Sequence, residues 1–165
     1  MIRPMTTNDV PRVAEIHVFG WRSTARGAVS DDFLFNQLLV ANNTDFLVKA
    51  LESQDTDCFV YDDGIIKGYL MLGECPNSTE TLMLKAVYVD PLLQGGGVGT
   101  ALLNFFDETA KKRGYKNARL LVIEGNATAR AFYEKKGYIL DGIRNYLKKM
   151  DTYDVGYTRQ VNHEN

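Results

Sequence analysis

Cysteine and histidine are scarce in this 165-residue chain, which contains two of each. Two cysteines, Cys58 and Cys75, are too few for the disulfide framework of a small secreted protein. The histidines, His17 and His163, lie near opposite ends of the sequence, and no Cys/His cluster has the spacing of a zinc site. We therefore expect free thiols and no bound metal.

A large charge of one sign and long apolar runs are also absent. The chain has 19 Lys and Arg residues against 21 Asp and Glu, a formal net charge of −2, so its overall charge does not attract nucleic acid. No apolar run approaches the roughly 20 residues of a transmembrane helix. No apolar segment typical of a signal peptide follows residues 1–5. These absences predict a cytoplasmic protein without a nucleic-acid or membrane partner.

The length suits a single domain over residues 1–165. Apolar periodicity and turn residues divide the chain into segments of both kinds. We expect strands over 2–5, 58–61, 65–72, 81–89, 118–123, 138–147 and 153–160. We expect helices beginning near residue 8 or 9 and over 31–39, 45–52, 98–113 and 127–136. This order predicts an α/β (α+β) fold in which helices flank a mixed central sheet.

Four glycines stand within five positions, at 95–97 and 99, between an expected strand and an expected helix. A helix start offers unpaired N–H groups and a positive dipole end, and glycine lets phosphate oxygens approach those groups without a Cβ clash. A P-loop needs Lys after the last glycine, but Thr100 and Ala101 follow Gly99. The glycines also lack the spacing of a dinucleotide-binding motif. A diphosphate is therefore a sensible ligand, while a plain flexible loop stays open.

A second candidate pair is Asn126 and Tyr133, at the start of the last expected helix. Seven residues make almost two helical turns, so the two positions share a face to within about 20°. The ordinary alternative is that Asn126 caps the helix and Tyr133 packs in the core. By itself the pair does not decide between these interpretations.

Taken together, these segments resemble the GNAT superfamily of acyl-CoA N-acyltransferases. The resemblance rests on the segments 87–91 (VYVDP), 94–99 (QGGGVG) and 132–138 (FYEKKGY), and on Asn126. It covers about residues 84–140. Segments 16–22, 31–34 and 141–144 also resemble a broad bacterial branch of that superfamily. The resemblance implies a GNAT-like single domain whose mixed sheet has two splayed strands that accept the coenzyme A arm.

The resemblance also implies roles for particular residues. Backbone amides of residues 95–100 would hold the diphosphate, the main chain of 87–89 would pair with the pantetheine arm, and one amide there would polarise the thioester carbonyl. Asn126 would bind the pantetheine, and Tyr133 would assist the departing thiolate as the catalytic residue. The implied cofactor-binding residues are Val87, Tyr88, Val89, Gly95, Gly96, Gly97, Val98, Gly99, Thr100 and Asn126.

The implied reaction is transfer of an acetyl group from acetyl-CoA, the cosubstrate, to a primary amine by direct attack in a ternary complex. The acceptor would be a small-molecule or peptide amine, and a homodimer is left open. The alternative is a non-catalytic acyl-CoA-binding sensor module of the same fold. Retained Tyr133 counts against a sensor.

Met83 departs from the family pattern, because many members have a proton-accepting Glu at its position. Ala25 stands where the branch tends to have Tyr. Strand alternation would place Met83 on the same face as Val87 and Val89 unless a bulge shifts the register. Glu80 and Glu124 are the nearest carboxylates in sequence, although a solvated surface role is the simpler interpretation for both.

Overall fold

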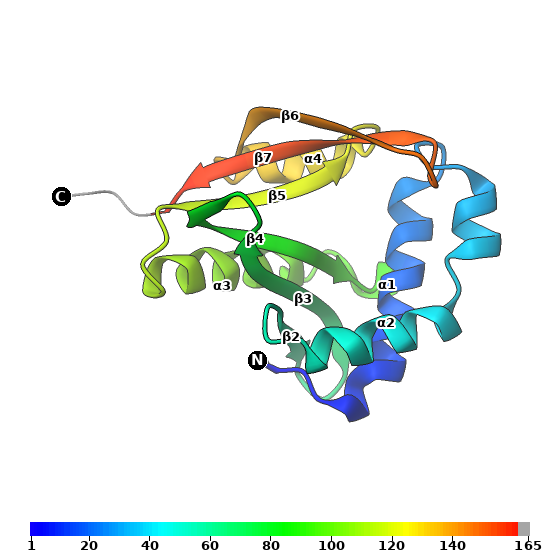
Figure 1. The fold of residues 1–165 in the computed structure, drawn as a ribbon. Helices are drawn as coiled ribbons and strands as arrows, with labels where there is room; N and C mark the ends of the chain where they lie inside the picture. The colour runs from blue at the N-terminus through cyan, green and yellow to red at the C-terminus, as the bar shows by residue number, and fades with distance from the viewer. Residues whose placement is uncertain (162–165) are drawn as a thin grey trace.

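Seven strands form one mixed sheet in the computed structural model, which describes residues 1–161 (Figure 1). The strands are β1 (Ile2–Pro4), β2 (Asp57–Asp62), β3 (Ile66–Cys75), β4 (Ser78–Val89), β5 (Asn117–Ile123), β6 (Ile139–Leu147) and β7 (Thr152–Gln160). Their order across the sheet is β1-β2-β3-β4-β5-β7-β6. Every neighbouring pair is antiparallel except β4 and β5, which are parallel. The expected mixed α/β fold is confirmed.

The helices are α1 (Val10–Ala25), α2 (Val40–Glu52), α3 (Val98–Lys112) and α4 (Ala127–Lys135), with short 3₁₀ turns η1 (Thr7–Asp9) and η3 (Pro91–Leu93) and a π-helical turn η2 (Phe33–Gln37). Pro11 lies in the first turn of α1, where its missing N–H has no intrahelical partner to lose. Gly114 and Gly137 end α3 and α4 with φ of 81° and 86°, as expected of left-handed residues that follow a helix.

Several boundaries differ from the expectation; β3, for example, ends at Cys75 rather than residue 72. The segment 31–39 ends in the π turn η2, in which Leu38 N donates to Phe33 O at 2.8 Å. Helix α2 begins at Val40 rather than residue 45, because buried Leu47 anchors the helix and overrides the poor propensity of its polar first turns. Strand β4 begins at Ser78 rather than residue 81, since the segment around Pro76 is a tight hairpin and not a loop.

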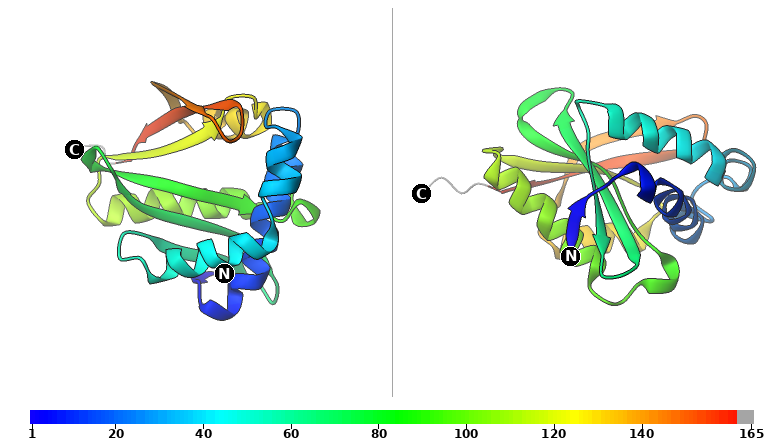
Figure 2. Two further views of the ribbon diagram at one scale, coloured as in Figure 1. Left: turned by 45° about the vertical axis from the view of Figure 1, so that its right-hand side comes forward. Right: turned by 90° about the horizontal axis from the view of Figure 1, so that it is seen from below.

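The two faces of the sheet carry separate cores, visible as the two helical layers in Figures 1 and 2. Alternation along β3 divides its side chains between them: Tyr69 and Met71 pack against α1 and α2, whereas Leu70 and Leu72 pack against α3. Each fully buried aliphatic side chain of this kind contributes about 1.5–3 kcal/mol. The sheet is therefore held rigidly on both sides of its centre.

The centre of the sheet is where β4 and β5 separate. They pair only from Thr81–Asn117 to Leu84–Leu120, and beyond this point the two strands diverge toward α1 (Figure 1). On its other edge β4 has a bulge, because Leu72 pairs with Leu84 and Met71 with Ala86. One sheet thus opens into a V with its vertex at Leu84 and Leu120.

The bulge at Lys85 corrects the expected alternation along this strand. An extra residue reverses the side-chain direction of everything that follows. Val87 and Val89 therefore pack with the α3 core, and Tyr88 with the α1 core. Met83 points to the α1 face, opposite to Leu84, and does not share a face with Val87 and Val89.

Candidate functional site

A cavity of about 800 Å³ occupies the V between β4 and β5. Its walls include residues 83–89 of β4 and 120–123 of β5. On the α3 and α4 face it is lined by Gln94, Gly95, Gly97, Val98, Gly99, Thr100, Asn126, Thr128, Ala129, Phe132 and Tyr133. On the α1 face it is lined by Gly20, Trp21, Thr24, Ala25, Leu147, Met150 and Asp154. The opening between the strands thus connects both faces of the sheet.

The glycine loop enters the cavity as the start of α3. Gly97 is the N-cap of the helix with φ 79°, and Gly95 has φ 90°, so both adopt a left-handed conformation that favours glycine. The first helical hydrogen bond runs from Ala101 N to Gly97 O at 2.9 Å. The N–H groups of Val98, Gly99 and Thr100 therefore precede the helical ladder, and an anion at this end of the cavity would satisfy them.

Asp90 holds the turn that leads into this loop. One carboxylate oxygen accepts a hydrogen bond from Leu92 N at 2.8 Å, and the other accepts one from Arg12 of α1 at 2.5 Å. The ion pair is half-buried, with the Asp90 side chain 11% exposed and that of Arg12 33% exposed. The start of the glycine loop is thereby fixed to a helix on the opposite face of the sheet.

Tyr133 lies on α4 and is 8% exposed. Its ring contacts Phe132 and Tyr138 edge-on, at centroid distances of 5.4 and 6.1 Å. Burial raises the pKa of the Tyr133 phenol to about 12. Within residues 1–161 the hydroxyl has no hydrogen-bond partner. The side chain therefore brings a protonated, unengaged O–H donor to the cavity.

Asn126 is the N-cap of α4, since its Oδ1 accepts a hydrogen bond from Ala129 N at 3.1 Å. The capping interpretation is thus confirmed for the side-chain oxygen. Asn126 also lines the cavity, and its amide Nδ2 is left to donate to a ligand. Both interpretations of this residue apply, each to a different atom.

Aromatic side chains form the wall on the α1 face. Trp21 contacts Phe33 and Tyr88 at centroid distances of 6.0 and 6.1 Å. Behind Tyr88, His17 contacts its ring at 5.3 Å and hydrogen-bonds the Tyr69 hydroxyl. Burial lowers the pKa of His17 to about 4. His17 is therefore a neutral packing residue at pH 7 rather than a lining group.

The two carboxylates nearest in sequence lie outside the cavity. Glu80 pairs with Lys116 at 2.7 Å on the surface. Glu124 forms a two-pronged ion pair with Arg144 at 2.8 and 2.9 Å, which lowers its pKa. Among the described residues that line the cavity, the carboxylate is Asp154 of β7. The sequence signal for it was a charged residue between the apolar or aromatic residues Tyr153 and Val155.

The structure brings together almost all of the expected site residues. Tyr133 and every expected cofactor-binding residue except Gly96 line the same cavity, and Met83 and Ala25 line it as well. Gly96 lies in the exposed part of the loop. Cys58 and Cys75 are both buried, free and absent from the lining, so neither supplies a nucleophile there.

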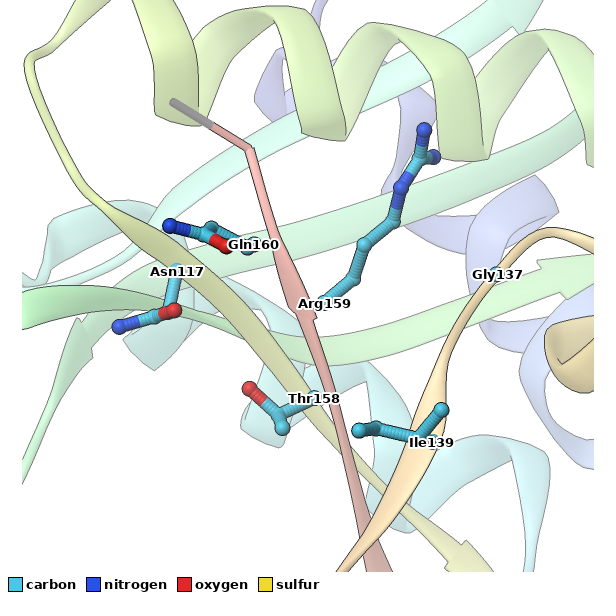
Figure 3. Close-up of a pocket in the computed structure, with 6 residues that line it drawn as sticks. All are labelled: Asn117, Gly137, Ile139, Thr158, Arg159 and Gln160. Carbon is cyan, nitrogen blue, oxygen red and sulfur yellow. The ribbon is translucent and has the colours of Figure 1, made fainter. Parts of the chain in front are cut away.

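A second hollow, of about 450 Å³, lies at the other end of β5 and β7 (Figure 3). Two of its polar side chains are already engaged: Arg159 extends toward α3, where it pairs with Asp107 at 2.6 Å, and Thr158 donates to Ala118 O at 3.2 Å. Gly137 and Ile139 complete one side. None of the residues that line this hollow lines the cavity between β4 and β5.

Within residues 1–161, no helix combines the length and hydropathy needed to cross a bilayer. The same part of the chain contains no group of three or more His, Cys, Asp or Glu side chains arranged to hold a metal ion.

Solved structures that share this arrangement of strands and helices include N-acetyltransferases. The PaiA N-acetyltransferase of Thermoplasma acidophilum, solved in complex with coenzyme A, superimposes with a TM-score of 0.76 at 19% identity, covering 97% of this chain and 98% of that one. This similarity defines the fold. The family model for the acetyltransferase (GNAT) family matches residues 28–138. The chain belongs to that family, which confirms the resemblance seen in its motifs.

Most of the curated relatives match only part of the chain. The uncharacterized protein YxbD of Bacillus subtilis is 38% identical over 66 residues, 40% of each chain. A spermidine N(1)-acetyltransferase of Thermoplasma acidophilum is 22% identical over 142 residues, covering 83% of this chain and 86% of that protein. The chain spans less than half the length of the first four curated relatives it matches.

Proposed function

We propose that the protein transfers an acetyl group from acetyl-CoA to a primary amine by direct attack in a ternary complex. The observation that carries this proposal is the cavity at the split of β4 and β5. It combines the unpaired N–H groups of a glycine-rich helix start with the unengaged hydroxyl of Tyr133. The first feature suits a diphosphate, and the second suits a leaving group that becomes an anion.

The cosubstrate would bind along the α3 and α4 side of the cavity. Its diphosphate would accept hydrogen bonds from the amides of Val98, Gly99 and Thr100, each contributing about 1.5–3 kcal/mol. The main chain of Val87, Tyr88 and Val89 has no partner on the β5 side, so it is available to pair with the pantetheine arm as a strand would. Nδ2 of Asn126 would bind the same arm, and the N–H of one β4 residue would polarise the thioester carbonyl.

Tyr133 would stabilise the departing thiolate by a hydrogen bond. Its pKa of about 12 lies roughly 3.5 units above that of a free thiol. Complete proton transfer from Tyr133 to the thiolate would then cost about 5 kcal/mol. A hydrogen bond that strengthens as the carbon–sulfur bond breaks avoids this cost, and the proton that sulfur finally receives can come from the amine itself.

A non-catalytic acyl-CoA sensor is the second candidate, and Met83 favours it because a thioether in the cavity wall cannot accept a proton. The test is release of free thiol from acetyl-CoA by the purified protein with a panel of primary amines. The similarity to a spermidine N(1)-acetyltransferase supports including polyamines. Amine-dependent thiol release with formation of the N-acetyl product supports the enzyme; binding of acetyl-CoA without release supports the sensor.

A further inference from the structure

Asp154 is a buried carboxylate that faces the proposed acyl-transfer cavity. It is 9% exposed and lies on β7 between Ile123 of β5 and Asn145 of β6 in the strand register. Its neighbour Val155 packs into the α3 core, so Asp154 points to the opposite face, toward α1. The strand pattern therefore places a charge where an apolar core residue would ordinarily stand.

The carboxylate is only partly satisfied. Asn145 Nδ2 donates to Oδ1 at 2.8 Å, and within residues 1–161 no cation pairs with either oxygen. Lys85 is the cation in the cavity wall, but its ammonium donates to Asp55 O and Thr56 Oγ1, both at 2.8 Å and both outside the lining. A buried carboxylate without a cation is unfavourable, so the site is suited to a cationic partner.

Asp154 lies on the side of the cavity that the glycine loop does not occupy. It is level with Ile123, three residues beyond the last β4–β5 pair at Leu120, or about 10 Å along the strand. The other residues that line the cavity on the α1 face include Trp21, Leu147 and Met150, all apolar in their bulk. A single negative charge in an apolar wall favours a ligand that carries a cationic group on an apolar skeleton.

We propose that Asp154 binds the ammonium group of the acceptor and thereby makes the enzyme specific for cationic alkylamines. This inference rests on the proposed function. Asp154 is a recognition residue in this account: it holds the protonated amine at the mouth of the V, and solvent removes the proton before attack. Neutral nucleophiles of the same shape, such as alcohols, would leave the carboxylate unpaired and bind weakly.

The first experiment measures binding rather than turnover. Ligand-observed NMR titrations of the protein saturated with coenzyme A use 2-phenylethylamine and its uncharged analogue 2-phenylethanol. Wild type is expected to prefer the amine by about tenfold or more, the value of one charged hydrogen bond. Asp154→Asn keeps the oxygen that Asn145 binds but loses the charge, and should lose that preference while binding the alcohol as before. Equal preference in both proteins, or no preference in wild type, overturns the inference.

Two further variants separate charge from structure. Asn145→Ala removes the hydrogen bond to Asp154 but keeps the charge, so the preference for the amine should persist. Glu124→Gln removes a carboxylate outside the cavity and serves as the matched control. If Asn145→Ala abolishes the preference as fully as Asp154→Asn does, local structure and not charge explains the effect, and the inference fails.

Kinetics with the best amine of the thiol-release panel completes the test. Asp154→Asn should raise the KM for the amine about tenfold or more, with the KM for acetyl-CoA unchanged. An unchanged amine KM overturns the role of Asp154 and leaves the acetyltransferase proposal intact. Amine-selective binding with no thiol release from any amine has the opposite meaning: the cation site is supported, and the proposed function fails.

Discussion

Replacement of Gly99 by Ala should separate ligand binding from stability. A Cβ at Gly99 would meet Val89 Cγ2 at 3.7 Å and Phe132 Cζ at 4.0 Å, both ordinary contact distances. The backbone there is right-handed helix, which Ala prefers to Gly by about 1 kcal/mol. Since Val89 and Phe132 both line the cavity, the added methyl group stands inside it. The free protein therefore tolerates a group that a bound diphosphate would not.

The expected magnitudes follow from these distances. Gly99→Ala should leave the free energy of unfolding unchanged or raise it by up to about 1 kcal/mol. Its affinity for coenzyme A should fall about tenfold or more, equivalent to the loss of one charge-assisted hydrogen bond at about 1.5–3 kcal/mol. Gly97→Ala should behave differently, because φ of 79° at that position costs a residue with a Cβ about 1–2 kcal/mol of stability.

Gly96→Ala is the matched control. No atom lies within 4 Å of a Cβ built there, its φ is ordinary, and the residue does not line the cavity. Titration calorimetry with coenzyme A and urea unfolding of the same samples give both quantities. Gly99→Ala with wild-type affinity, or Gly96→Ala with an equal loss, would refute the placement of the diphosphate.

Three further predictions concern titratable groups. Tyr133→Phe should lower kcat about 10- to 1000-fold with coenzyme A affinity little changed. If the variant keeps the wild-type kcat while the chemical step is rate-limiting, Tyr133 is only a packing residue. Folding favours the neutral form of His17. The free energy of unfolding should therefore fall by about 1.4 kcal/mol for each unit by which the pH is lowered from 6.5 to 4. His17→Gln should reduce that slope by about 1.4 kcal/mol per pH unit in urea titrations, and a slope equal to the wild-type value would assign it to other groups. The wild-type kcat/KM should rise with pH up to the pKa of the acceptor amine, and Met83→Glu should extend activity to lower pH. An inflection near pH 5–7 that disappears in Glu124→Gln would instead identify Glu124 as a dedicated base.

Local sequence patterns predicted most of the elements, and nearly all of the expected site residues line the cavity. The glycines at 95, 97 and 99, Asn126 and Tyr133 depend on short-range chemistry: turn conformation, capping and helical spacing. These signals are complete within a dozen residues. The resemblance to a known family then added the expectation that two strands separate, which periodicity alone does not contain.

The rest depends on contacts between distant segments. The bulge at Lys85 is set by pairing with β3, more than ten residues away, so alternation within β4 misplaced Met83. The π turn before α2 depends on how buried Leu34 and Leu38 pack against α1 and β5. Asp154 was missed because its place beside Ile123 of β5 and in the wall of the cavity is set by strand pairing, not by its neighbours in sequence.

The separation of β4 and β5 leaves the sheet with interior edges. Residues 85–89 of β4 and 121–123 of β5 share no backbone hydrogen bonds. The sheet therefore lacks several interstrand hydrogen bonds at its centre. A cosubstrate arm that pairs with β4 would supply some of them and would act as a temporary strand. By mass action such a ligand raises the free energy of unfolding by about 2.7 kcal/mol at 100 times its Kd. The cell's supply of acyl-CoA would then determine both how fast the protein works and how much of it stays folded.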